Sequence, residues 1–158
     1  MREAVDIERT YQQQTAPAGS LFETFAEQVL RRTEDVIAGR DCLIPPTAVQ
    51  MLFVKLLQRH QGEGRACSRL IWAEYLQVND RTLRELVQSL RQDFGVAIGT
   101  ATNGGYFLIA TREEFDEAIR QLTLHAVTVL RVAKGMSGGR YEDLLHQLRL
   151  QLNTEDAR

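Results

Sequence analysis

Apolar residues between Ser20 and Gly39 recur at helical spacing, which predicts a first helix. Ser20 can accept hydrogen bonds from the free amides at the start of this helix, and Glu23, three residues on, completes a capping box. Gly39 is expected to end it. Residues 1–19 are polar and predict a flexible lead-in, so residues 20–46 are assigned to an N-terminal helix and its linker.

Three further helices are expected between residues 47 and 94. One covers residues 47–60 and follows two prolines that interrupt the chain. A short one covers residues 69–76, and Asn79 or Asp80 can cap the next, which extends to about Phe94. Two short helices joined by so few residues form the helix-turn-helix arrangement.

The helix that starts near Asp80 has distinct apolar and polar faces. Its inward positions are Leu83, Leu86, Val87 and Leu90. Its other faces carry Arg81, Arg84, Glu85, Gln88 and Arg91. Arginine, glutamine and glutamate are side chains that read base edges and grip phosphates. An ordinary solvated helix face is the alternative interpretation, and Glu85 can simply pair with Arg81 at the i, i+4 spacing.

The hydrophobic period changes after Gly95. Val96, Ile98, Tyr106, Leu108 and Ala110 alternate with smaller or more exposed neighbours. The sequence Asn103-Gly104-Gly105 between them is turn chemistry, so a β-hairpin is predicted. Residues 47–110 therefore form the central domain, and the fold class is mainly α with a small β-hairpin.

Residues 111–153 are predicted to form C-terminal helices that serve dimerisation or partner docking. Thr111 and Glu114 form a second capping box at the start of a long helix that reaches about Lys134, and another helix is expected from Tyr141 to Leu152. A 4-3 repeat along the long helix is typical of a coiled-coil seam. The seam consists of Phe115, Ile119, Leu122, Ala126, Val129 and Ala133. Packing of this stripe on the chain's own core is the alternative.

The composition of the chain predicts its cellular location and shows how charge is distributed along it. Hydrophobic residues make up 44% of the chain and charged residues 25%, as in ordinary globular proteins. No apolar run is long enough to cross a membrane, and two cysteines fit a reducing compartment, so a cytoplasmic location is expected. The net charge is −2, but residues 47–112 hold eight basic and five acidic residues, a charge of +3. Only this middle third has the electrostatic footprint of a DNA-binding module.

The residues give little support to catalysis or metal binding. His60, His125 and His146 are far apart, and none has a partner at ligand spacing. The glycine clusters lack the lysine and hydroxyl residues of a phosphate loop, and there is no nucleophile elbow. We therefore expect no metal, no cofactor and no enzymatic activity.

The segment from Leu56 to Ala110 resembles the winged helix-turn-helix domains of bacterial and phage regulators, including biotin-operon-repressor-like DNA-binding domains. The resemblance rests on Ala73-Glu74-Tyr75-Leu76-Gln77-Val78, Asn79-Asp80-Arg81-Thr82-Leu83-Arg84, Leu90-Arg91, Gly95-Val96-Ala97-Ile98 and Gly104-Gly105-Tyr106-Phe107-Leu108. The helix that opens with Thr111-Arg112-Glu113-Glu114 is similar to that of phage-type versions. Gln77 stands where the family usually has a small residue, so it must adopt whatever backbone the turn requires.

The resemblance implies that the helix beginning near Arg81 docks in the major groove of DNA, with the hairpin near the backbone or minor groove. The residues it nominates for DNA contact are Arg69, Asn79, Arg81, Thr82, Arg84, Glu85, Gln88, Arg91, Thr102 and Asn103. Winged helices also bind proteins, so the fold by itself does not fix the function.

Two functions are therefore expected from the sequence. The first is a transcriptional regulator of phage or mobile-element type, which binds double-stranded DNA as a homodimer and acts by occupying its site. The second is a non-enzymatic accessory subunit of a replication, recombination or defence complex, in which the winged helix docks onto another protein. The acidic flanks on both sides of the central domain favour the second.

Overall fold

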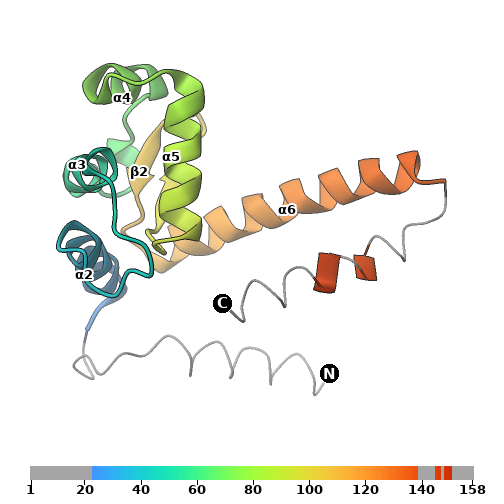
Figure 1. Ribbon diagram of the computed structural model, residues 1–158, viewed down its shortest axis with the longest axis horizontal. Coiled ribbons are helices and arrows are strands. Elements are labelled where there is room, and N and C mark those ends of the chain that lie inside the picture. Colours follow the sequence, from blue (N-terminus) through green and yellow to red (C-terminus); the bar gives the residue numbers. More distant parts are fainter. Residues whose placement is uncertain (1–22, 139–144, 147, 151–158) are drawn as a thin grey trace. The chain divides into compact units, whose positions relative to one another are not determined.

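The computed structural model describes residues 23–138, 145, 146 and 148–150. Along the chain the elements are α2 (Phe25–Ile37), α3 (Ala48–Leu57), the 3-10 helix η1 (Glu63–Arg65), α4 (Arg69–Leu76), α5 (Asp80–Gln92), β1 (Ile98–Thr100), β2 (Tyr106–Leu108) and α6 (Arg112–Met136) (Figure 1). The predicted class, mainly α with a small hairpin, is confirmed. The order of elements is compatible with a winged helix.

The first described helix begins later than the sequence predicts. Its N-cap is Thr24, whose hydroxyl accepts from the Glu27 amide while the Glu27 carboxylate accepts from the Thr24 amide at 2.8 Å. The expected capping box of Ser20 and Glu23 is therefore wrong, because Glu23 lies before the helix and its carboxylate pairs with Arg31 at 3.0 Å. The sequence contains two consecutive capping-box patterns, Ser20 with Glu23 and Thr24 with Glu27, and the helix begins at the second.

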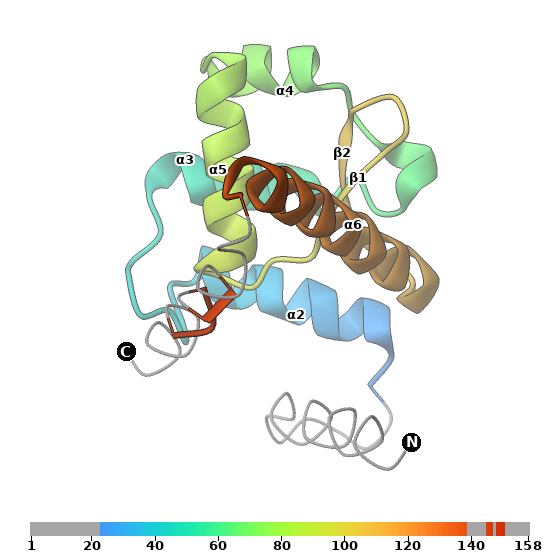
Figure 2. The same ribbon diagram turned by 90° about the vertical axis from the view of Figure 1, so that its right-hand side faces the viewer.

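The helix-turn-helix forms as predicted, with Ser68 capping α4 and Asn79 capping α5 through its side-chain oxygen. Gln77 ends α4 in the left-handed conformation, with φ 54° and ψ 42°. The turn therefore requires of Gln77 a backbone that small residues, above all glycine, adopt most easily. In both views α4 crosses the N-terminal end of α5 (Figures 1 and 2).

The hairpin pairs β1 with β2 in antiparallel register, with Ile98 opposite Leu108 and Thr100 opposite Tyr106. The expectation that alternate residues are exposed is wrong, because Phe107 and Ile109 are buried together with Tyr106 and Leu108. Gly99 makes room for the Phe107 ring: a Cβ at this glycine would lie only 2.3 Å from a ring carbon.

The segment before α4 extends this small sheet. Cys67 makes an isolated antiparallel bridge with Tyr106, donating its amide to the Tyr106 carbonyl at 3.0 Å and accepting in return at 2.9 Å. Gly105 passes so close that an added Cβ would lie 2.7 Å from the Cys67 carbonyl oxygen. The start of α4 is thereby fixed to the base of the hairpin.

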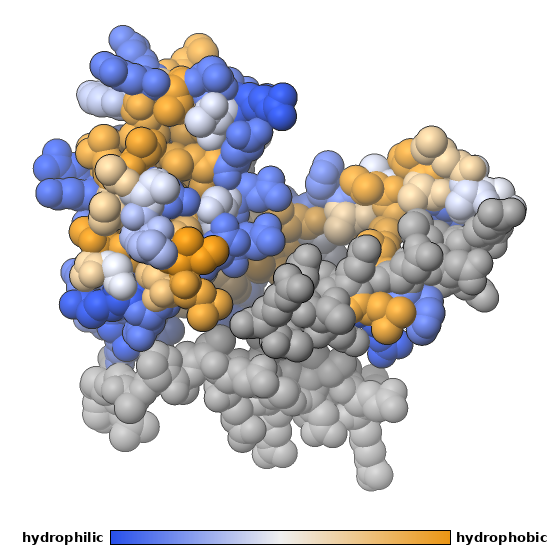
Figure 3. All heavy atoms as spheres, in the orientation of Figure 1, coloured by the Kyte–Doolittle hydropathy of each residue, from blue (hydrophilic) through white to orange (hydrophobic). Residues whose placement is uncertain are grey.

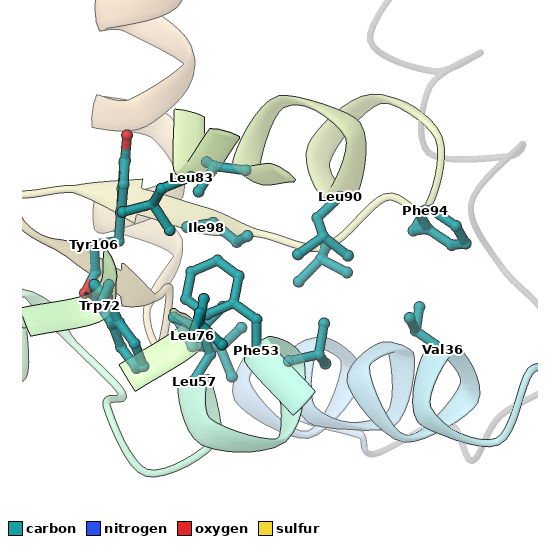
Figure 4. Packing of buried hydrophobic residues seen from close by; sticks show 14 of the residues in the cluster. Val36, Phe53, Leu57, Trp72, Leu76, Leu83, Leu90, Phe94, Ile98 and Tyr106 are labelled. Atoms are coloured by element: carbon teal, nitrogen blue, oxygen red, sulfur yellow. Dashed lines mark hydrogen bonds between the residues drawn. The ribbon is translucent and has the colours of Figure 1, made fainter. Parts of the chain in front are cut away.

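One hydrophobic core joins these elements. Figure 4 shows Leu83 and Leu90 pointing from α5 toward Phe53 and Leu57 of α3, with Trp72 and Tyr106 at one end of the core and Val36 and Phe94 at the other. The rings of Phe53 and Trp72 meet edge to face, with centroids 5.0 Å apart. Even the buried Thr33 hydroxyl is satisfied, since it donates to the Leu30 carbonyl and accepts from Gln58.

By its contacts the chain forms two units, Met1–Arg112 and Glu113–Arg158. The second unit contains almost all of α6, a helix of 25 residues. The lead-in at residues 1–19 and much of the expected helix from Tyr141 to Leu152 fall outside the described residues, although residues 145, 146 and 148–150 are helical. In the part of the chain that the structure describes, no helix is long and apolar enough to cross a membrane.

The left-handed backbone of Gln77 predicts that glycine at this position stabilises the protein. A left-handed backbone costs an L-residue roughly 1–2 kcal/mol, whereas glycine adopts it freely but loses more entropy on folding. Gln77→Gly is therefore expected to raise the free energy of unfolding by about 0.5 kcal/mol, measured by urea denaturation. Gln88→Gly, at an exposed position within α5, is the matched control and should lower it by about 0.5–1 kcal/mol. Equal losses in both variants would contradict the conformation of Gln77.

Candidate nucleic-acid interface

The face of α5 opposite the core is a stripe of long polar side chains. Arg81, Glu85, Gln88 and Gln92 are all exposed and follow one another at intervals of four, three and four residues. Such spacing places them on one line along the helix. Gln92 was missed in the sequence analysis, although its position four residues after Gln88 is the signal that identifies it. We call these four residues the outward stripe.

The exposed arginines of α5 are held by ion pairs within the helix. Arg81 donates to Glu85 at 2.9 Å, and Arg84 lies 3.0 Å from the Asp80 carboxylate. The Arg81 side chain keeps 85% of its surface exposed and that of Arg84 keeps 59%. Exposed pairs contribute little net energy, so either guanidinium can exchange its carboxylate for another anion at small cost.

Arg69, on the first turn of α4, lies where three elements meet. Its guanidinium is 3.7 Å from the Asp80 carboxylate at the start of α5. It also borders the hairpin tip, since a Cβ on Gly104 would lie 3.8 Å from its Nε. Arg69, Arg84 and the tip of the hairpin, which are separated in sequence, are thus brought together in the folded chain.

Arg91 differs from the expectation that it faces outward. Its Nε donates to the Ile98 carbonyl at 2.9 Å and its Nη2 to the Thr100 hydroxyl at 3.0 Å. Burial lowers the pKa of this guanidinium from its ordinary value. Two hydrogen bonds to β1 make Arg91 a tie between α5 and the hairpin. The i+10 spacing from Arg81 alone could not reveal this tie, because it depends on where β1 packs.

The remaining nominated residues lie at the start of α5 and at the hairpin tip. Asn79 uses its side-chain oxygen as the cap of α5 by accepting from the Thr82 amide at 2.8 Å, and Thr82 is itself exposed. At the tip, the Thr102 amide donates to Glu63 at 3.3 Å, while the Asn103 side chain accepts from the Gly105 amide at 3.0 Å. Both tip residues are exposed. The tip therefore has internal order before any ligand arrives.

Polar contacts also fix α5 on the side that faces α2 and α3. The Gln50 side chain donates to the Ser89 hydroxyl at 3.0 Å, which in turn donates to Asp93 at 2.7 Å. From α2, the Nε of Arg32 donates to the Phe94 carbonyl at 2.7 Å, just beyond the end of α5. These contacts restrict rotation and sliding of α5, so the direction of the outward stripe is determined.

The expected seam of α6 lies along one face of that helix. The side chains of Ile119, Leu122 and Val129 are about half exposed, at 46%, 50% and 52%. Met136, three residues after Ala133, continues the same 4-3 repeat and is 85% exposed. Apolar side chains along α6 are visible in Figure 3.

Among the described residues there is no group of three or more His, Cys, Asp or Glu side chains that could hold a metal ion. Comparison of the chain with protein-family models, with curated proteins and with solved structures gave no match. The function therefore has to be inferred from the chemistry of this chain's own residues.

The position of Arg91 predicts a structural cost for its removal. Arg91→Met retains much of the aliphatic stem but removes both donors and leaves the Ile98 carbonyl without this partner. Because hydrogen bonds from a charged donor contribute about 1.5–3 kcal/mol, the free energy of unfolding should fall by about 2 kcal/mol. Hydrogen exchange should show the hairpin amides losing protection first. Arg81→Met is the control and should change stability by less than about 0.5 kcal/mol; an equal loss would place Arg91 outside the hairpin contact.

Proposed function

We propose that this chain binds double-stranded DNA through a winged helix-turn-helix composed of α3, α4, α5 and the hairpin. The observation that carries the proposal is the outward stripe of α5, where only long polar side chains occupy the face opposite the core. An α-helix fits the major groove, and arginine, glutamine and glutamate form hydrogen bonds with base edges there. In this proposal the chain acts by occupying its site and has no catalytic role.

Contacts to phosphates would come from the elements on either side of the stripe. Arg69 and Arg84 are exposed beside the start of α5, and the hairpin tip with Thr102 and Asn103 lies next to Arg69. The +3 charge of residues 47–112 supports DNA binding by this domain, because neutralising phosphates supplies much of the affinity for DNA. Arg91 would act indirectly, by fixing the hairpin against α5.

We further propose that the protein is a homodimer joined through α6 and acts as a transcriptional regulator. Within the described residues, α6 has no buried side chain, although its apolar stripe spans more than twenty residues from Phe115 to Met136. Two such stripes can pack as knobs into holes. A dimer would present two recognition helices to successive turns of the major groove, and the second contact would raise the affinity of a weakly basic module.

A second candidate function is supported by α4. On this helix Leu70 is 81% and Tyr75 68% exposed. Binding of a phosphate does not require exposed apolar side chains, whereas binding of another protein often does. An accessory subunit that docks onto another protein could use this surface. If the chain is such a subunit, replacing Leu70 and Tyr75 with Ser should abolish its complex with the partner protein. If the chain is a DNA-binding regulator, the same variant should still dimerise and bind DNA with unchanged affinity.

The first prediction for the proposed function concerns Arg81 and Arg84. Replacing both with Ala should weaken binding to a duplex first selected for tight binding from a pool of DNA fragments. The expected loss is at least about 2 kcal/mol, measured by fluorescence anisotropy. The matched control replaces Arg40 and Arg120 with Ala: both are ion-paired, and each side chain is 61% exposed, but they lie on other elements. If the two double variants lose equal affinity, the effect is one of net charge and α5 does not read DNA. Affinity should also fall steeply with added salt.

The second prediction concerns the seam of α6. Leu122→Asp places a charge in the seam and should convert a dimer into a monomer in sedimentation at tens of micromolar. Leu124→Asp is the matched control, since Leu124 is 52% exposed, compared with 50% for Leu122, but lies off the seam. It should leave the dimer intact. A monomeric intact protein, or a Leu122→Asp variant that unfolds outright, would contradict the dimer.

A further inference from the structure

Arginines from two helices converge on the carboxylate of Asp80, Arg69 from α4 and Arg84 from α5. Its Oδ2 is 3.0 Å from Nη2 of Arg84, and its Oδ1 is 3.7 Å from Nε of Arg69. Arg84 also donates from Nε to the Asp80 carbonyl at 3.4 Å. All three side chains are between 43% and 59% exposed, so the cluster is open to solvent.

The surroundings of this carboxylate match what a DNA phosphate would meet. Guanidinium groups bind carboxylates and phosphates through the same planar arrangement of donors. The hairpin tip adjoins Arg69, with the Cβ position of Gly104 3.8 Å from its Nε. Asp80 thus lies where α4, α5 and the hairpin come together.

We propose that Arg69 and Arg84 form one binding site for a DNA phosphate, and that Asp80 opposes its occupation by holding both guanidiniums in the free protein. This inference rests on the proposed function. Asp80 then lowers the phosphate contribution to affinity equally on every sequence, so that tight binding depends more on the base contacts of the outward stripe. A site with the right bases compensates for this loss, and a random sequence does not.

The test compares binding of the full-length protein to a labelled duplex of mixed sequence, about 30 base pairs long to cover successive major-groove turns. Asp80→Asn removes the competing charge and should raise affinity about threefold to tenfold, the effect of one unit charge at these distances in water. It should also steepen the plot of log affinity against log salt by about 0.9, the value for one added phosphate contact.

Three further variants separate this effect from net charge and from structure. Glu117→Gln makes the same charge change at a carboxylate that is also 46% exposed and is ion-paired with Arg120, and it should stay within about twofold of the intact protein. Asp80→Glu retains the charge and should retain the original affinity. Adding Arg69→Gln to Asp80→Asn should cancel the gain.

Several results would overturn the inference. Equal affinity gains in Asp80→Asn and Glu117→Gln would reduce it to net charge. A loss of affinity in both Asp80→Asn and Asp80→Glu would make Asp80 a structural residue. Binding by the intact protein without any gain in Asp80→Asn would contradict this inference alone, whereas no binding by any of the proteins at low salt would contradict the proposed function as well.

Discussion

The burial of one face of α5 is the interaction on which the rest of the structure depends. Leu83, Val87 and Leu90 are at most 2% exposed and pack in the core with residues of α3, α4 and the hairpin. Each such side chain contributes roughly 1.5–3 kcal/mol when it leaves water. Because a helix is rigid, burying this face also determines where the opposite face points. The outward stripe is therefore positioned by the core and not by its own interactions.

Polar contacts add what apolar packing cannot provide, which is direction. Apolar burial tolerates small rotations of a helix, but hydrogen bonds are lost when donor and acceptor move apart. Three hydrogen bonds hold α5 in this way. Gln50 of α3 donates to the Ser89 hydroxyl on α5, and Arg32 of α2 donates to the Phe94 carbonyl just beyond its end. From α5 itself, Arg91 donates to the Ile98 carbonyl of the hairpin. Arg91 reaches the hairpin with a second hydrogen bond as well, to the Thr100 hydroxyl. An arginine that looks like a phosphate ligand in sequence thus serves to orient the elements around it.

The exposed charges are arranged differently from the buried contacts. Arg81, Arg84 and Arg69 are each paired with a carboxylate at the surface, where water and salt weaken the attraction. Such ion pairs favour one position of a long side chain but contribute little energy, so the side chain can still move to another partner. In the proposed DNA-binding role, partial neutralisation of these arginines would reduce the sequence-independent part of the binding energy.

The sequence alone determined those features that depend on local chemistry. Ser68 and Asn79 cap their helices, and the inward period of α5 gives its core face, because both depend on residues within one or two turns. At Ser20 the same local reasoning was wrong, since two consecutive capping patterns compete and Thr24 caps the helix. Only the tertiary structure decided that Arg91 binds β1, that Phe107 is buried against Gly99, and that Arg69 and Arg84 meet at Asp80. Each of these contacts joins consecutive elements across a turn or loop. The way those elements approach one another is set by the shared core, which no local pattern encodes.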